Sequence, residues 1–251
     1  MSLFDLSGKK ALVTGGSRGL GFGMAQALLQ AGADVAIVGL SDRVYRAAAD
    51  LQAIGPCVLP LQADLSDRSQ VQAMFDNAVE QLGGLDILLV NHGAQRRNPA
   101  VEFSLEDWDF IIEVNLSSMF MLNQLAGKIM LAQGKGKIIN VASLLTITGG
   151  ITVPAYAASK GGVGQLTKAL SNEWAGHHIN VNAIIPGYMA TDMNEALIND
   201  PARSTMILNR IPAGRWGTPD DVKGVAVFLA SSASDYVNGV LIPVDGGWLA
   251  R

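Results

Sequence analysis

The sequence predicts an α/β protein built on a single Rossmann-type, doubly wound parallel sheet of about seven strands, with helices on both faces. Short apolar runs of strand length alternate along the chain with longer segments of helical periodicity. That alternation is typical of βαβ units with right-handed crossovers. The short runs are apolar at nearly every position, as expected when helices cover both faces of a parallel sheet.

The predicted elements follow one another from the first strand, KALVT, to the last, GVLIPVD. Strands are expected at 10–14, 34–39, 57–62, 86–90, 137–143, 179–185 and 239–245. Helices are expected at 19–31, 42–54, 68–82, about 104–132, 156–176 and 220–231. Segment 187–217 interrupts the alternation, and a long irregular stretch inside a compact domain is more often functional than a boundary. We therefore expect residues 1–251 to form one domain, with 187–217 as an irregular loop segment.

The composition excludes several classes of protein. Of 251 residues, 49% are hydrophobic and 16% charged, which permits a large core and argues against disorder. The net charge of −4, without a basic block, gives no indication of nucleic-acid binding. A single cysteine, Cys57, excludes an internal disulfide and a cysteine-cluster metal site, and we predict no metal. Neither a signal peptide nor a membrane span is indicated, so a cytoplasmic protein is expected.

The stretch TGGSRGLG, residues 14–21, lies where the first strand should turn into the first helix. Glycines there permit a tight turn and let backbone N–H groups approach a pyrophosphate, while the helix N-terminus supplies partial positive charge. The loop therefore predicts that the domain binds a dinucleotide. The expected cofactor contacts in this loop are Gly15, Ser17, Arg18, Gly19, Leu20 and Gly21.

The variant Thr-Gly-x-x-x-Gly-x-Gly resembles the short-chain dehydrogenase/reductase family, and six ordered motifs extend the resemblance over essentially the whole chain. The resemblance implies four catalytic residues, namely Asn115, Ser143, Tyr156 and Lys160. It also implies cofactor contacts by Tyr156, Lys160, Asp64, Asn91, Gly93, Pro186, Gly187 and Thr191. The family usually forms homotetramers through its fourth and fifth helices and its C-terminus, so a homotetramer is expected.

Tyr156 and Lys160 stand four residues apart, which places both on one face of a helix. A free tyrosine has a pKa of about 10, and a nearby ammonium or the positive ring of an oxidised nicotinamide lowers that pKa. Tyr156 then takes a proton from an alcohol while hydride leaves for the cofactor, and Ser143 hydrogen-bonds the substrate oxygen. By resemblance, Asn115 anchors a water that connects Lys160 to solvent. The alternative is that Ser143 and Asn115 only cap local turns.

The motif VNHG departs from the family pattern Asn-Asn-Ala-Gly at two positions. Val90 replaces the first asparagine and His92 replaces the alanine. Hydrogen bonding near the cofactor is therefore expected to be rearranged. A histidine at this place could reach substrate or cofactor, but a structural contact is the more probable role for His92.

The sequence leaves the choice between NAD and NADP open. An acidic residue at the end of the second strand would bind the ribose hydroxyls of NAD, yet Gly39, Leu40 and Ser41 occupy this place. Arg18 and Arg43 could bind a 2′-phosphate, which favours NADP. Members of the family branch described next favour NAD, so the expected cofactor is NAD or NADP.

Three C-terminal stretches resemble the sugar-acid branch of the family: RIPAGRWG (210–217), SSASDYVNG (231–239) and VDGGWLAR (244–251). A sugar acid needs a partner for its carboxylate, and a guanidinium can bind one in a bidentate way. Two arginines follow the fourth strand, on the side where ligands bind in open α/β sheets. The predicted substrate contacts are Arg97, Arg96, Tyr188 and Met189.

The sequence thus predicts an NAD(P)-dependent oxidoreductase for a secondary alcohol or ketone of a sugar acid such as a deoxy-gluconate. Two alternatives stay open at this point. One is a carbonyl reductase for an acyl or other apolar ketone. The other is a dinucleotide-binding subunit without turnover.

Overall fold

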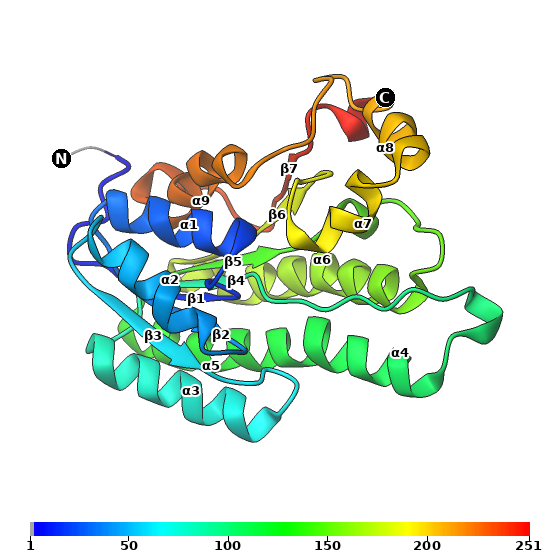
Figure 1. Ribbon diagram of the computed structural model, residues 1–251. Coiled ribbons are helices and arrows are strands. Elements are labelled where there is room, and N and C mark those ends of the chain that lie inside the picture. Colours follow the sequence, from blue (N-terminus) through cyan, green and yellow to red (C-terminus); the bar gives the residue numbers. More distant parts are fainter. Residues whose placement is uncertain (1–2) are drawn as a thin grey trace.

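A single sheet of seven parallel strands forms the centre of the computed structural model, which describes residues 3–251 (Figure 1). The strand order β3-β2-β1-β4-β5-β6-β7 is that of a doubly wound sheet, as the sequence predicts. The strands are β1 (Lys10–Thr14), β2 (Asp34–Gly39), β3 (Val58–Gln62), β4 (Ile87–Val90), β5 (Gly136–Val141), β6 (Ile179–Pro186) and β7 (Leu241–Val244).

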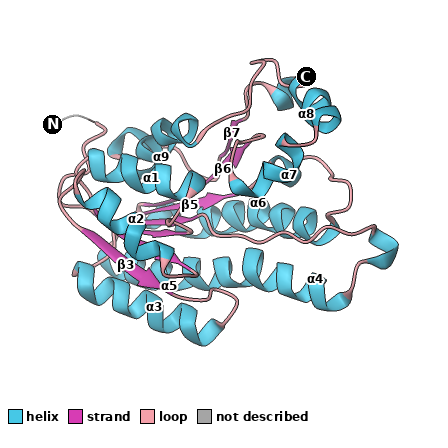
Figure 2. Ribbon diagram, in the orientation of Figure 1, coloured by secondary structure: helices cyan, strands magenta, loops and turns pink. Residues whose placement is uncertain are grey.

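Helices cover both faces of the sheet (Figure 2). One face packs against α1 (Gly19–Gln30), α2 (Arg43–Gln52) and α9 (Lys223–Ala230). The other face packs against α3 (Arg68–Leu82), α5 (Ser118–Gln133) and α6 (Pro154–Trp174). In β1, the side chain of Leu12 packs in the core beneath α3, α5 and α6, while those of Ala11 and Val13 pack in the core beneath α1, α2 and α9. Alternation of side chains along each strand thus explains why the strands are apolar throughout.

The helix expected at about 104–132 is interrupted. It consists of α4 (Leu105–Ile112), a π-helical turn at Glu113–Ser117 and α5. A π turn inserts one extra residue into a helix without changing its apolar character, so hydrophobic periodicity does not reveal it. Such turns occur frequently at functional sites, and this one contains Asn115.

Segment 187–217 is more regular than the sequence suggests. It contains two short helices, α7 (Glu195–Ile198) and α8 (Pro201–Leu208), which lie above the carboxyl end of the sheet near the C-terminus (Figure 1). Pro201 opens α8, and the Asp200 side chain caps it by accepting hydrogen bonds from two backbone N–H groups. Among residues 3–251, no helix has the length and apolarity needed to cross a membrane.

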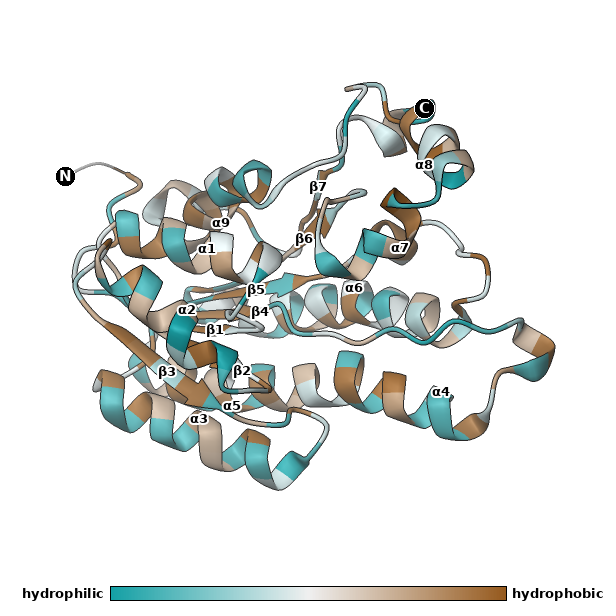
Figure 3. Cartoon of the chain, viewed as in Figure 1, coloured by the Kyte–Doolittle hydropathy of each residue, from teal (hydrophilic) through white to brown (hydrophobic). Residues whose placement is uncertain are grey.

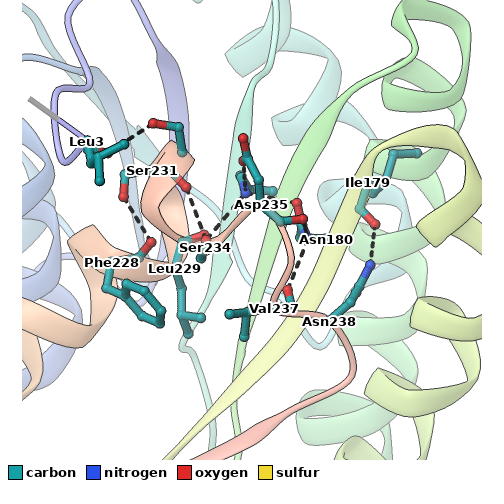
Figure 4. Close-up of polar contacts among 12 residues, drawn as sticks. Leu3, Ile179, Asn180, Phe228, Leu229, Ser231, Ser234, Asp235, Val237 and Asn238 are labelled. Carbon is teal, nitrogen blue, oxygen red and sulfur yellow. Dashed lines mark hydrogen bonds and ion pairs between the residues drawn. The ribbon is translucent and has the colours of Figure 1, made fainter. Parts of the chain in front are cut away.

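The stretch 231–239 joins the amino end of β6, as Figure 4 shows. The Asn238 side chain donates to the Ile179 carbonyl at 2.9 Å and accepts from the Val181 N–H at 2.8 Å. The Asn180 side chain donates to the carbonyls of Asp235 and Val237 at 3.0 Å each. Ligands bind at the carboxyl ends of parallel strands, so these contacts lie at the opposite edge of the sheet. The motif therefore stabilises the fold and does not contact substrate.

Asn238→Ala should lower the free energy of unfolding by about 2 kcal/mol, because it leaves two main-chain groups of β6 without partners. Turnover should be unchanged, since the edge involved is remote from the site. Urea denaturation together with initial rates measures both, and Asn77→Ala on the exposed surface of α3 is the control. A loss of turnover at unchanged stability would contradict this interpretation.

Candidate active site

The candidate site lies at the carboxyl ends of the strands, where the strand order reverses. β1 and β4 are neighbours in the sheet, with Thr14 opposite Val90. The chain leaves β1 into α1 on one face, while the chain after β4 leads to α5 on the other face. Diverging connections of this kind open the crevice that binds ligands in doubly wound sheets.

The loop between β1 and α1 is shaped for close approach of a dinucleotide. Gly15 and Gly19 have φ values of 63° and 54°, a region that favours glycine. A Cβ on Gly21 would stand 2.1 Å from the Gly15 carbonyl oxygen, so no larger residue fits there. No side chain caps the N-terminus of α1, which leaves its N–H groups available to a pyrophosphate. These features fit the expected cofactor.

Thr14, His92 and Ser118 form a buried hydrogen-bonded chain beside this loop. The Thr14 hydroxyl lies 2.8 Å from His92 Nδ1, and Ser118 Oγ lies 2.7 Å from His92 Nε2. Ser118 donates its proton to the Val114 carbonyl at 2.7 Å, so it must accept from Nε2–H. His92 Nδ1 then accepts from Thr14, whose oxygen accepts the N–H of Asn91 at 3.0 Å. His92 is thus a neutral structural residue, as the sequence suggests.

Asn115 connects the π turn to the segment after β4 and to α6. Its Oδ1 accepts from the Ala94 N–H at 2.8 Å, and its Nδ2 donates to the Ala94 carbonyl at 2.9 Å. Nδ2 also lies 3.2 Å from Ser159 Oγ, which donates to the Tyr156 carbonyl at 2.8 Å. The side chain therefore positions two parts of the site, and it does not cap a helix.

Lys160 is 3% exposed and points into the site from α6. Its Nζ donates to the Val141 carbonyl at 2.8 Å and lies 5.8 Å from the centre of the Tyr156 ring. Burial lowers the pKa of Lys160 to about 8. A Cβ on Gly93 would stand 3.2 Å from Asn115 Oδ1 and 3.9 Å from Nζ, so Gly93 lies directly beside both side chains.

Ser143 caps a turn and also contacts Tyr156, while its binding of the substrate oxygen stays a prediction. Its hydroxyl accepts from the Leu145 N–H at 3.2 Å and is hydrogen-bonded to Tyr156. Burial raises the pKa of Tyr156, while this hydrogen bond and the charge of Arg97 act in the opposite direction. The lowered tyrosine pKa expected from the sequence is therefore not a property of the protein alone. Lys160 donates one of its three ammonium hydrogens to the Val141 carbonyl.

Thr146 is a positioning residue that sequence reasoning misses. Its hydroxyl accepts from the Ser143 N–H at 3.3 Å and donates to the Lys160 carbonyl at 2.9 Å, which joins the end of β5 to α6. A threonine three residues after Ser143 is a capping-box spacing, and that signal could have indicated it.

The other predicted cofactor residues lie around the same edge. Thr191 stands beside the glycine loop, because a Cβ on Gly19 would lie 3.5 Å from its methyl group. Gly187 follows Pro186 at the end of β6 and packs so closely on Asp245 that a Cβ would lie 2.5 Å from the Asp245 Cα. Asp64 follows β3 and accepts from the N–H and hydroxyl of Ser66, at 2.9 and 2.7 Å. Ser17 lies beside Gly39, and Leu20 packs partly buried at the start of α1.

The side chains of the two predicted substrate arginines, Arg96 and Arg97, have different partners. Arg96 forms an ion pair with Asp107 at 3.4 Å and lies over the Phe110 ring, so it faces α4 rather than the site. Arg97 donates to the Gln95 side chain at 3.0 Å, and no carboxylate among the described residues pairs with it. Burial and the charge of Arg203 lower the pKa of Arg97, and the guanidinium interacts electrostatically with Tyr156 and Tyr188.

Tyr188 and Met189 differ in surroundings. The Tyr188 ring packs against Trp216 and Trp248, with ring centres 5.6 and 4.7 Å away, and this aromatic group forms one wall near Arg97. Met189 is 3% exposed and packs beside Gly217 in the core on the α1 and α9 face of the sheet, so it offers little surface to a substrate. The two tryptophans were missed as site residues, although both lie in the C-terminal stretches that resemble the family.

Comparison with known proteins agrees with this geometry. A family model described as enoyl-(acyl carrier protein) reductase matches residues 15–249. A 2-dehydro-3-deoxy-D-gluconate 5-dehydrogenase of Escherichia coli is 52% identical, over 100% of this chain and 99% of its own. The chain belongs to the short-chain dehydrogenase/reductase family. It is an oxidoreductase that acts on CH–OH groups and uses NAD or NADP.

Two solved structures of this dehydrogenase family are also similar to the chain. A structure from Agrobacterium tumefaciens with bound NADP has 47% identity and a TM-score of 0.94, covering 100% of both chains. A gluconate 5-dehydrogenase from Burkholderia cenocepacia, in complex with NADP and tartrate, has 39% identity and a TM-score of 0.94. It covers 99% of this chain and 98% of its own.

Burial of His92 makes the stability of the dehydrogenase pH-dependent. Burial, and then the charge of Lys160, lower the pKa of His92 from 6.5 to about 3. Below pH 6.5, His92 becomes protonated in the unfolded chain but stays neutral in the folded chain. The free energy of unfolding therefore falls as the pH is lowered. This residue alone should remove about 2 kcal/mol between pH 7 and pH 5.

Urea denaturation of the wild type and His92→Gln at both pH values measures this loss. The stability gap between them should narrow by about 2 kcal/mol at pH 5. His177→Gln, at an exposed turn, is the control and should keep the wild-type slope. Equal pH slopes for the wild type and His92→Gln would contradict a neutral, buried His92.

Proposed function

We propose that this dehydrogenase interconverts the secondary alcohol and ketone of a sugar acid, such as a deoxy-gluconate, with Arg97 binding the carboxylate. The observation that carries the proposal is the guanidinium of Arg97. It lies within electrostatic reach of Tyr156 and Tyr188, and no carboxylate of residues 3–251 pairs with it. A charged substrate group supplies that partner. The E. coli relative is named for a sugar acid of this kind, which supports the proposal.

Each of the four predicted catalytic residues has a separate role in the reaction. The bound nicotinamide supplies or accepts the hydride. Tyr156 gives a proton to the carbonyl oxygen in reduction and takes it back in oxidation, and its raised pKa keeps the phenol protonated near neutral pH. Ser143 binds the same oxygen. Lys160 holds the nicotinamide ribose and carries the positive charge beside Tyr156, and Asn115 fixes the segment that borders both.

NADP is the preferred cofactor in this proposal. A cavity of about 530 Å³ next to the glycine loop is lined by Ser17, Arg18, Leu40, Ser41, Asp42, Arg43 and Arg46. The lining holds three guanidinium groups and the Asp42 carboxylate, and Asp192 beside it pairs with Arg18 and Arg43, so positive charge remains in excess and favours a 2′-phosphate over free ribose hydroxyls. NADP in the Agrobacterium and Burkholderia structures supports the same choice.

We further propose that the whole chain, 1–251, is one catalytic domain that works as a homotetramer in the cytoplasm. The family usually associates through its fourth and fifth helices, and the fourth helix expected from the sequence corresponds to α4 and α5, whose ribbons carry many apolar positions (Figure 3). The exposed large apolar residues on α5, on α4 and just before α4 are Val101, Leu105, Trp108, Phe120 and Leu131. Exposed apolar groups of this size are common at interfaces between subunits.

Tyr156→Phe should reduce turnover by about 10³-fold, because it removes the group that transfers the proton. NADPH binding, followed by nucleotide fluorescence, should change less than twofold. Tyr45→Phe, at an exposed position on α2, is the matched control and should keep full activity. Turnover at the wild-type rate in Tyr156→Phe would contradict the proposed mechanism.

Arg97→Ala should raise the KM for a sugar acid by about 10- to 100-fold, the usual effect of losing a charge-assisted hydrogen-bonded pair. The KM for an uncharged ketone should stay the same. Absorbance at 340 nm measures both reactions, and Arg96→Ala is the neighbouring control. Turnover only on uncharged acyl or apolar ketones, insensitive to Arg97, would overturn the substrate class and favour a carbonyl reductase.

A further inference from the structure

Asp192 forms ion pairs with two of the three arginines that line the cofactor cavity, Arg18 and Arg43. The Arg18 Nη1 atom lies 2.5 Å from Asp192 Oδ2, and Arg43 Nη1 lies 3.5 Å from the same oxygen. Arg18 belongs to the glycine loop and Arg43 begins α2, whereas Asp192 lies in segment 187–217, far along the chain. One carboxylate oxygen therefore joins three separate parts of the molecule.

The Asp192 carboxylate lies between Arg18 and Arg43 in the way that a phosphate monoester bound by both arginines would lie. Guanidinium groups bind carboxylate and phosphate oxygens with the same geometry. A phosphate monoester carries about −1.5 to −2 charges near pH 7, more than one carboxylate does. The Arg18 and Asp192 side chains are 61% and 59% exposed, and ion pairs so exposed contribute little to stability. A phosphate can therefore displace Asp192.

The charge of the carboxylate is present under assay conditions. The hydrogen bond from Arg18 is the main cause that lowers the pKa of Asp192 below its ordinary value, with Arg43 contributing in the same direction. Asp192 is consequently ionised throughout the neutral range, and it competes as an anion.

We propose that Asp192 is an internal competitor for the 2′-phosphate of NADP at Arg18 and Arg43, and so sets the preference between NADP and NAD. The inference rests on the proposed 2′-phosphate site. NAD lacks the 2′-phosphate, so it presents no phosphate monoester that competes with Asp192 for these arginines. NADP must break them, and its affinity is reduced by that competition.

The competition also connects the cofactor to the substrate side of the site. Asp192 directly follows Thr191, which stands beside the glycine loop. Tyr188 lies four residues before Asp192 in the same segment. Release of Asp192 by the 2′-phosphate frees this segment from the arginines. With NAD bound, the ion pairs of Asp192 still connect this segment to Arg18 and Arg43. With NADP bound, these ion pairs are broken.

The test is the affinity of the full-length protein and of Asp192→Asn for four nucleotides, measured by calorimetry. NADP and 2′,5′-ADP carry the 2′-phosphate, and NAD and ADP lack it. The variant should bind the first two about fivefold more tightly and the last two within twofold of the wild type. Asp220→Asn removes a comparable exposed ion pair, with Lys223, and should change none of the four affinities.

Arg43→Ala separates failure of this inference from failure of the cofactor site. If Arg43→Ala weakens NADP alone while Asp192→Asn changes nothing, the site stands and the competition is overturned. If Arg43→Ala leaves NADP affinity unchanged, the 2′-phosphate site itself is wrong, and the role of Asp192 falls with it. Equal tightening of NADP and NAD in Asp192→Asn would also overturn the competition, because it would show no selectivity for the phosphate.

Discussion

The buried hydroxyl of Thr14 is the point on which the site depends. It stands at the carboxyl end of β1, accepts the N–H of Asn91 and meets the ring of His92. Through His92 it reaches Ser118, immediately after the π turn that holds Asn115. The glycine loop, the end of β4 and the π turn are thus fixed relative to one another at the place where the strand order reverses. A polar network so deeply buried is stable only when every member is satisfied, and here each donor finds an acceptor.

The second fixed element is α6, which carries Tyr156 and Lys160 against the end of β5. Ser143 and Thr146 join that strand end to the helix, and the Lys160 ammonium binds the Val141 carbonyl. Ser143, Tyr156 and Lys160 therefore lie on a strand end and a helix, whereas Tyr188 at the substrate wall and Asp192 at the cofactor edge lie on segment 187–217. This division places rigid groups at the reacting atoms and a displaceable ion pair at the cofactor edge.

The strands, the glycine loop and the order of the catalytic motifs could be predicted from the sequence, because each is a local pattern. The contacts between distant segments could not: His92 meets Thr14 across 78 positions and Ser118 across 26. The π turn was missed because one extra residue leaves the apolar pattern intact. Arg96 and Arg97 look equivalent in sequence, and only the position of Asp107 directs one of them to α4.

The central proposal is that the site of hydride transfer recognises a carboxylate on its substrate. The most direct measurement is kcat/KM with NADPH, at 340 nm, for a keto-gluconate-type acid and for a neutral polyol ketone of the same length. We expect a preference for the acid of at least about tenfold, the minimum expected from a charge-assisted contact. Equal values, or faster turnover of the neutral ketone, would contradict it.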